Sequence, residues 1–549
     1  MCPLTRDTFL FCIFAKNTKK GDMKYPVGIQ TFQKIIEGGY VYVDKTDLIY
    51  SLAHGGDIYF LSRPRRFGKS LLVSTLENYF LGRKELFKGL AIEKLETEWK
   101  EYPVFRMDFN GSNYVGDAGA LENKINSYLN NWEKQYDVRK ESGSDFGTRF
   151  ANILKNVHGQ TGLKCVVLID EYDKPLLDVL GSGLMVDVDG NRVTLEERNR
   201  DIMKAFYSTL KLADEDLQFV FLTGVTKFAK VSVFSGFNQP LDISMDPRYD
   251  TLCGITEEEI SRYFGESVRA MADKFKCDVS ELRRRLKLKY DGYNFCEEMR
   301  GVHNPYSLLC SFAQRKLDDY WFSSGTPTYL INLLDRDNVN MDEIVGKYYA
   351  SEEFMDFKMD RDAPIPMLYQ SGYLTIKGYD SEMNMYLLDI PNNEVRGGFI
   401  PLLMNDYFSL NTPMKTPVAE MVKCLKNGDA ERFETLLASF LSSIPYNMRP
   451  KKETERFFHY TFYLILRLIG TFVVFTEKCQ SQGRVDCVIE TDRFVYVFEF
   501  KLDGTAEEAL RQIEEKGYAR EYASDGRRLF RIGCVFSSET GTIGEWLVN

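Results

Sequence analysis

The sequence has no long apolar run, no closely paired cysteines and no excess of positive charge. No stretch approaches the roughly 20 apolar residues of a membrane-spanning helix, and the apolar run 10–14 is too short for a secretory signal. We therefore expect no membrane segment and a cytoplasmic location. The eleven cysteines are scattered without a Cys-x-x-Cys pair, which favours reduced thiols over disulfides or a zinc site. A net charge of −10 leaves room only for local nucleic-acid-binding patches.

A phosphate-binding loop is predicted near the front of the chain. The apolar run 58–61 precedes residues 62–70, and residues 71–80 have the apolar spacing of a helix. Strand, loop and a helix that opens with Gly-Lys-Ser are the arrangement of a P-loop. Backbone N–H groups and the positive helix end would hold phosphate, and Lys69 would reach the terminal phosphates. The predicted nucleotide contacts are Arg66, Phe67, Gly68, Lys69, Ser70 and Leu71, with the Ser70 hydroxyl also a ligand for Mg²⁺.

The usual first glycine of such a loop is missing. Arg63 stands in its place, five positions before Gly68, so the bare pattern fails. The alternative is a Gly-Lys-Ser helix start that binds nothing, but the placement between strand and helix favours nucleotide binding. Arg63, Arg65 and Arg66 are candidates for phosphate or partner contacts, or for anchors of the loop. None is identified as an arginine finger.

Two further strands carry polar residues at their ends. The apolar run 165–169 ends in Asp170 and Glu171. Asp170 is predicted to hold Mg²⁺ and Glu171 to polarise the attacking water; the alternative is a buried strand that happens to end in acids. The run 219–222 ends at Thr223, either a sensor of the γ-phosphate or a cap of the next turn, which we weigh equally. Together with expected strands at 40–43 and 104–109, these runs predict a parallel sheet with helices between its strands.

A second set of chemical residues lies near the back of the chain. Alternation along the expected strand 494–501 puts Glu499 and Lys501 on one face, and Phe498 and Phe500 in the core. With Asp486 on the adjacent strand, this is the PD-(D/E)xK nuclease pattern, although an edge strand with surface charge would look similar. Asp486 and Glu499 would hold Mg²⁺, and Lys501 would orient or deprotonate the water. The auxiliary candidates are Glu455 on the preceding helix, with Glu453 as its competitor, and Gln512 on the following helix, with Tyr518 less favoured.

These motifs resemble a family of bacterial proteins that join an AAA-ATPase-like domain to a C-terminal PD-(D/E)xK domain. The resemblance spans nearly the whole chain from about Met23, a plausible alternative start, and an arginine at the first glycine position is normal for that family. It implies ATP binding and a nuclease-type fold, and it leaves the biological substrate open. The segments that carry it are 25–28, 42–46, 63–70, 168–175, 290–293, 391–396 and the nuclease strands.

The predicted fold is α/β: a P-loop NTPase (AAA+-like) parallel sheet with a helical lid, a winged-helix-like middle region and a restriction-endonuclease-like α/β C-terminal domain. The expected boundaries are 1–23 for an N-terminal extension, 24–253 for the P-loop domain, 254–345 for the lid, 346–430 for the winged-helix-like connector and 431–549 for the nuclease-like domain. A chain of 549 residues is too long for a single core.

The function expected from these parts is an ATP-binding and ATP-hydrolysing protein coupled to a Mg²⁺-dependent nuclease that acts on DNA. ATP and Mg²⁺ are the expected cofactors, DNA is the expected partner, and a homo-oligomer is a possible state. One alternative is an ATP-dependent switch or binding module whose nuclease fold does not cleave. Another is an ATPase that acts on protein partners.

Overall fold

The computed structural model describes residues 23–56, 58–140, 143–228, 240–323, 341–356, 364–408, 415–444, 454–469, 473–480, 483–523 and 525–549. It confirms the α/β class. The N-terminal part contains a five-stranded parallel sheet in the order β2-β3-β6-β1-β7. The strands are β1 (Ile58–Ser62), β2 (Val104–Asp108), β3 (Cys165–Asp170), β6 (Leu217–Gly224) and β7 (Leu241–Asp242).

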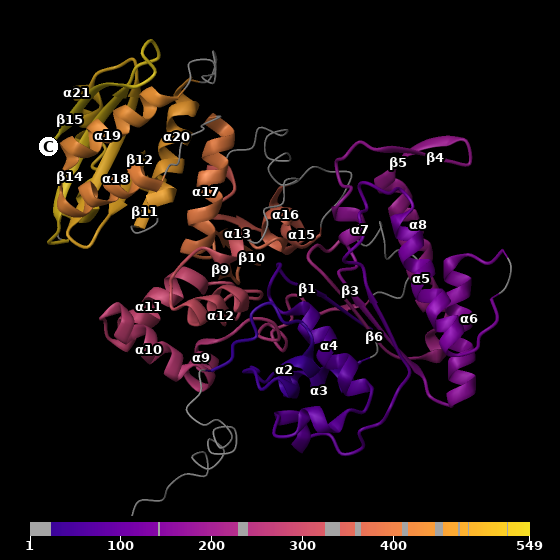
Figure 1. Cartoon of the computed structure of the whole chain (residues 1–549). Coiled ribbons are helices and arrows are strands. Elements are labelled where there is room, and N and C mark those ends of the chain that lie inside the picture. Colours follow the sequence, from indigo (N-terminus) through magenta and orange to yellow (C-terminus); the bar gives the residue numbers. More distant parts are fainter. Residues whose placement is uncertain are drawn as a thin grey trace, which may run out of the picture.

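The centre of this sheet is covered on both faces. Every residue of β3 is buried, as expected for a parallel strand with helices on each side. The contacting helices include α4 (Lys69–Phe80) and α6 (Phe146–Thr161), while α5 (Ala120–Gln135) and α8 (Leu195–Leu212) pack against α6. Because the strands are parallel, the carboxyl ends of β1, β3 and β6 meet at one edge (Figure 1).

The strand predicted for residues 40–43 is wrong, because this segment pairs with no strand of the described sheet. Its backbone bonds instead to the preceding loop, where Val41 N donates to Lys24 O at 3.0 Å. The side chains of Val41 and Val43 pack on the helical lid, so the apolar alternation reflects burial between two parts of the chain. Helix α2 (Phe32–Glu37) precedes this segment and α3 (Thr46–Gly55) follows it.

The lid has a hydrophobic core of its own, which includes Phe264, Met271 and Leu308. Thr256 and Glu259 form a capping box at its first helix, which satisfies backbone N–H groups that a helix start leaves unpaired. The helices are α9 (Glu257–Tyr263), α10 (Gly265–Phe275), α11 (Val279–Tyr290), α12 (Pro305–Gln314) and α13 (Tyr320–Ser323).

The middle region contains a helix followed by a hairpin, in the order that was predicted. Helix α16 (Pro364–Gln370) precedes β9 (Thr375–Asp380) and β10 (Met385–Asp389). The hairpin bonds to the loop after α11, because Asn294 N donates to Thr375 Oγ1 at 2.8 Å. The hairpin therefore packs against the loop between α11 and α12 of the lid, and its winged-helix-like character stays a prediction. The remaining elements are β8 (Lys347–Tyr349), which joins the hairpin in the order β8-β10-β9, α15 (Ser351–Met355) and α17 (Asn393–Phe408).

The C-terminal part is a five-stranded mixed sheet in the order β11-β12-β13-β14-β15, in which only β13 and β14 run parallel. The strands are β11 (Val473–Gln480), β12 (Gly483–Glu490), β13 (Phe494–Leu502), β14 (Arg528–Phe536) and β15 (Ile543–Val548). The helices are α18 (Lys415–Asn427), α19 (Ala430–Ser443), α20 (Thr454–Ile469) and α21 (Ala506–Glu515). Figure 1 shows α17 and α20 between this sheet and the middle region.

Helices α18 and α19 lie on either side of the predicted domain boundary, yet both contact the C-terminal sheet. Tyr496 on β13 donates its hydroxyl to Leu425 O of α18 at 2.7 Å. The ring of Phe433 on α19 lies 6.3 Å from that of Phe498. The C-terminal unit defined by these contacts begins before residue 431.

A two-stranded ribbon, β4 (Met185–Val188) and β5 (Asn191–Thr194), stands between the short helix α7 (Lys174–Leu177) and α8. It projects beyond the helices of the P-loop domain (Figure 1), and Met185 at its start is exposed. Within the described residues no helix combines the length and the apolar character needed to cross a membrane.

Candidate nucleotide and nuclease-type sites

The predicted P-loop joins β1 to α4. Gly68, at the N-cap of α4, has a φ of 96°, a backbone conformation that glycine adopts with little strain. The side chain of Lys69 is buried, and its ammonium donates to Arg63 O at 3.0 Å and to Pro64 O at 3.3 Å. Its Nζ also lies 3.6 Å from Glu171 Oε1. The predicted phosphate-binding and water-polarising residues therefore meet at this edge of the sheet.

Asp170 lies at the same edge, at the end of β3. Its side chain is fully buried, and neither carboxylate oxygen has a hydrogen-bond partner among the described residues. Burial, reinforced by the nearby Glu171, raises the pKa of Asp170 to about 6; Ser70 and Lys69 lower it in part. The Ser70 hydroxyl is thus close to Asp170, although the geometry does not complete a hydrogen bond. An unpaired buried carboxylate beside a hydroxyl suits a Mg²⁺ ion, which prefers oxygen ligands.

Thr223 lies between the P-loop, which follows β1, and Asp170, which ends β3, because β6 runs between these two strands. Its side chain is buried, and the hydroxyl donates to Leu61 O of β1 at 2.8 Å. This bond ties β6 to β1 directly beside the P-loop. The sensor role of Thr223 stays a prediction.

The three arginines of the loop have different environments. Arg63 is 1% exposed, donates to Ser244 O at 2.7 Å and to Tyr249 O at 3.3 Å, and stacks 3.9 Å from the ring of Phe295. It is an anchor of the loop. Arg65 and Arg66 are exposed, and Arg66 lies 5.0 Å from the ring of Tyr306 on the lid.

The loop is also held from outside. The indole of Trp321 donates to Arg65 O at 3.0 Å, and Phe67 packs edge-on against Tyr293 with ring centroids 4.8 Å apart. Trp321 belongs to α13 and Tyr293 to the loop between α11 and α12, so both contacts come from the lid. They hold the loop in place from the lid side.

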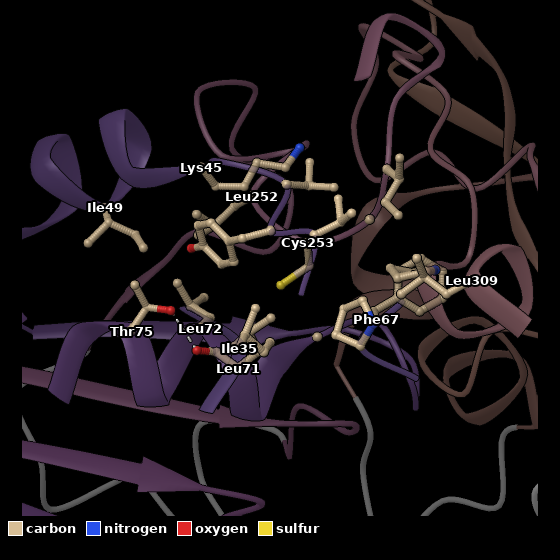
Figure 2. Close-up of a pocket in the computed structure, with 18 of the residues that line it drawn as sticks. Ile35, Lys45, Ile49, Phe67, Leu71, Leu72, Thr75, Leu252, Cys253 and Leu309 are labelled. Carbon is tan, nitrogen blue, oxygen red and sulfur yellow. Dashed lines mark hydrogen bonds between the residues drawn. The ribbon is translucent and has the colours of Figure 1, made fainter. Parts of the chain in front are cut away.

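An apolar cavity of about 100 Å³ adjoins Gly68 and Leu71. Figure 2 shows it between the start of α4, the segment around Lys45 and the strip that includes Leu252 and Cys253. Sequence reasoning did not identify this cavity, although the motif 42–46 supplies part of its wall. The full lining is Pro26, Ile35, Val41, Tyr42, Val43, Lys45, Ile49, Phe67, Gly68, Leu71, Leu72, Thr75, Leu252, Cys253, Gly254, Ile255, Phe264, Pro305 and Leu309.

The nuclease-type residues converge on β13. Glu499 is 1% exposed. The Gln512 side-chain amide on α21 donates to Glu499 Oε1, and Lys501 Nζ donates to Gln512 Oε1 at 2.7 Å. Lys501 Nζ also lies 3.5 Å from Glu499 Oε1. The predicted alternation is observed, because Phe498 and Phe500 instead pack with Phe462 on α20.

Asp486 is close to Glu499 across the hairpin of β12 and β13. Its Oδ2 accepts a hydrogen bond from Phe500 N at 2.8 Å. Burial, with Asp486 as the next contributor, raises the pKa of Glu499 to about 7, while Lys501 lowers it. Glu499 Oε2 is buried without a partner from any described residue. The two carboxylates could hold a divalent cation, although no three acidic, histidine or cysteine side chains converge within the described residues.

The two auxiliary acids, Glu455 and Glu453, lie at or before the start of α20. Glu455 belongs to α20, but its side chain lies outside the described residues, as does Glu453 entirely. Tyr518, the less favoured partner of Gln512, is buried in a separate apolar cluster with Val485 and Ile513. Gln512 is therefore the helix residue that reaches Glu499 and Lys501.

Comparisons with known proteins divide the chain in the same way. The family model described as Predicted AAA-ATPase matches residues 26–234, and the one described as PD-(D/E)XK nuclease superfamily matches residues 453–546. A protein of Azotobacter chroococcum mcd 1, named "Uncharacterized protein in vnfD 5'region", is 34% identical over 534 residues, which is 96% of this chain and 99% of that protein. The chain therefore belongs to the family of this relative and joins an AAA-ATPase-like domain to a domain of the PD-(D/E)XK nuclease superfamily.

Proposed function

We propose that this protein binds and hydrolyses ATP and that its C-terminal domain is a Mg²⁺-dependent nuclease acting on DNA. The observation that carries the first half is the meeting of Lys69, Asp170 and Glu171 at one edge of the sheet. A buried lysine that is bonded to loop carbonyls can exchange those weak acceptors for phosphate oxygens, which form charge-assisted hydrogen bonds. The apolar cavity beside Leu71 then receives the base.

Each residue of the nucleotide site has one task. Lys69 binds the terminal phosphates, Asp170 and Ser70 would hold the metal, and the Glu171 carboxylate accepts a hydrogen bond from the attacking water. Mg²⁺, when bound, neutralises charge that develops on the phosphate oxygens. Thr223, near the end of β6 between the P-loop strand and β3, would sense the γ-phosphate.

The nuclease half of the proposal is supported by the bonded set of Glu499, Lys501 and Gln512. Asp486 and Glu499 would hold the metal, which supplies Lewis-acid activation of the phosphodiester. Lys501 orients the water and offsets charge in the transition state, and Gln512 fixes the amine and the carboxylate relative to each other. Nucleotide-driven rearrangement of the domains would gate this reaction.

The nuclease is tested by nicking of supercoiled plasmid with and without Mg²⁺. We compare the wild type with Lys501→Ala and with Lys516→Ala, a matched change at an exposed lysine. Loss of nicking in Lys501→Ala alone supports cleavage at this site. Equal background nicking by all three proteins favours the alternative, a switch or binding module with a non-cleaving nuclease fold.

The ATPase half has a separate test. Lys69→Ala is expected to abolish ATP binding because it removes the phosphate charge partner, whereas Lys84→Ala, at an exposed lysine, is not. Retained ATP binding by Lys69→Ala refutes the P-loop assignment. DNA as the partner is tested by titrating labelled DNA at several salt concentrations. Absence of salt-dependent binding points instead to an ATPase that acts on proteins.

A further inference from the structure

A second buried carboxylate follows the pair at the end of β3. Asp173 is fully buried, and its Oδ2 accepts hydrogen bonds from Val225 N at 3.0 Å and from Thr226 N at 2.6 Å. Asp173 precedes helix α7, yet its side chain makes no capping bond there. Burial of a carboxylate is costly unless hydrogen bonds compensate for the lost water. Because the side chain makes no bond to the helix, capping does not explain why this carboxylate is buried. Its bonds run instead to the end of β6.

Tyr172 reinforces the same connection. Its backbone N donates to Thr223 O at 3.1 Å. Its hydroxyl donates to Thr226 O at 2.8 Å and accepts from Phe228 N at 3.1 Å. The two residues directly after Glu171 are therefore bonded to the segment that begins at Thr223.

The fit between the two segments is close. A Cβ atom on Gly224 would lie 2.3 Å from Asp173 Oδ1 and 2.8 Å from Tyr172 Cδ1, so a larger residue at this position would displace the turn. Glu171 has a φ of 52°. This left-handed conformation is unfavourable for a glutamate and persists only where the surroundings hold it. Tyr172 and Asp173 supply that hold.

We propose that Asp173 is a positioning residue that fixes Glu171 relative to Thr223 at the phosphate edge of the nucleotide site. This inference rests on the proposed ATP hydrolysis. The turn at residues 171–173 and the end of β6 move as one body while Asp173 bonds to both N–H groups. Without those bonds the left-handed turn relaxes, and the carboxylate of Glu171 leaves the place where it can orient water. A displacement of about 1 Å costs up to roughly 100-fold in rate.

The test compares Asp173→Ala, Asp173→Asn and a control, Asp178→Ala, which removes a partly exposed acid that pairs with Lys174. We expect Asp173→Ala to lower kcat for ATP hydrolysis by about 10- to 100-fold. ADP affinity is expected to stay within about twofold, because the hydrogen bonds of Asp173 run to Val225 and Thr226 and not to Lys69. Asp173→Asn is expected to recover most of the rate, since its amide oxygen can accept both N–H groups. The control is expected to match the wild type.

Three outcomes overturn the proposal: a wild-type kcat in Asp173→Ala, a loss of ADP affinity in parallel with kcat, or an Asn variant as slow as the Ala variant. A wild type that fails to hydrolyse ATP refutes the proposed ATPase instead. The positioning role is then decided by binding. The ratio of the dissociation constants for ADP and the slowly hydrolysed analogue ATPγS is expected to change more than about threefold in Asp173→Ala, and an unchanged ratio overturns the role.

Discussion

Restoring the missing glycine of the P-loop is expected to harm this protein. Arg63→Gly brings the sequence closer to the general P-loop pattern, but it removes a side chain on which the loop depends. The guanidinium of Arg63 is buried and bonds to the carbonyls of Ser244 and Tyr249. These residues lie beyond β7, so the arginine joins the loop to a distant part of the domain.

The size of the effect follows from these contacts. Two buried carbonyls lose a charged donor, at about 1–3 kcal/mol each, and stacking on Phe295 contributes up to about 2 kcal/mol. Burial of the guanidinium is itself unfavourable and lowers the pKa of Arg63. The variant avoids this desolvation cost, which offsets several kcal/mol of the loss. A net destabilisation of the loop on the order of 3 kcal/mol remains, which corresponds to a roughly 100-fold higher population of open loop.

Hydrogen exchange measures this population locally. Amide protection across residues 62–70 is expected to fall about 100-fold in Arg63→Gly, and titration calorimetry is expected to give weaker ATP binding. Arg65→Gly, the same change at an exposed neighbour, should cost no more than about 1 kcal/mol. Unchanged protection together with equal or tighter ATP binding in Arg63→Gly would refute the anchoring role.

Three further predictions concern single carboxylates or their partners. Glu171→Gln should keep ATP binding and lower kcat by about 100-fold or more, because the amide cannot accept the water proton; normal phosphate release would reassign that role. Burial raises the pKa of Glu394 from 4.5 to about 7, so the folded state holds a proton that the unfolded state loses. Its contribution, about 3 kcal/mol, is present below pH 4.5 and is lost as pH rises to 7. Glu394→Gln should remove that slope in urea unfolding between pH 5 and 8, and an unchanged slope would contradict this. Gln512→Ala should slow Mg²⁺-dependent nicking by about 10- to 100-fold, whereas exposed Glu507→Ala on the same helix should not; equal rates would exclude a supporting role for Gln512.

Local sequence patterns predicted which segments form buried strands and which neighbouring side chains share a face of a strand. Alternation along β13 correctly placed Glu499 and Lys501 on one face. It also correctly placed Phe498 and Phe500 on the opposite face. The apolar run that ends at Asp170 correctly indicated a buried parallel strand. The first result depends on a period of two residues and the second on a short continuous apolar run, and both signals are visible in the sequence itself.

Features that depend on distant segments could not be predicted. The anchoring of Arg63 requires Ser244, Tyr249 and Phe295, which lie far along the chain. The segment around Val41 alternates like a strand, but burial against the lid rather than a sheet causes the pattern. The apolar cavity is built from several separate parts of the sequence, from Pro26 to Leu309. In each case tertiary contact overrides the local signal.

The β4–β5 ribbon has a practical use. Its strands pair only with each other among the described residues, and its tip at Asp189 and Gly190 is exposed. Exposed tips of this kind tolerate insertions well. A small epitope or a single dye attached there would report on the AAA-ATPase-like domain in a crowded mixture.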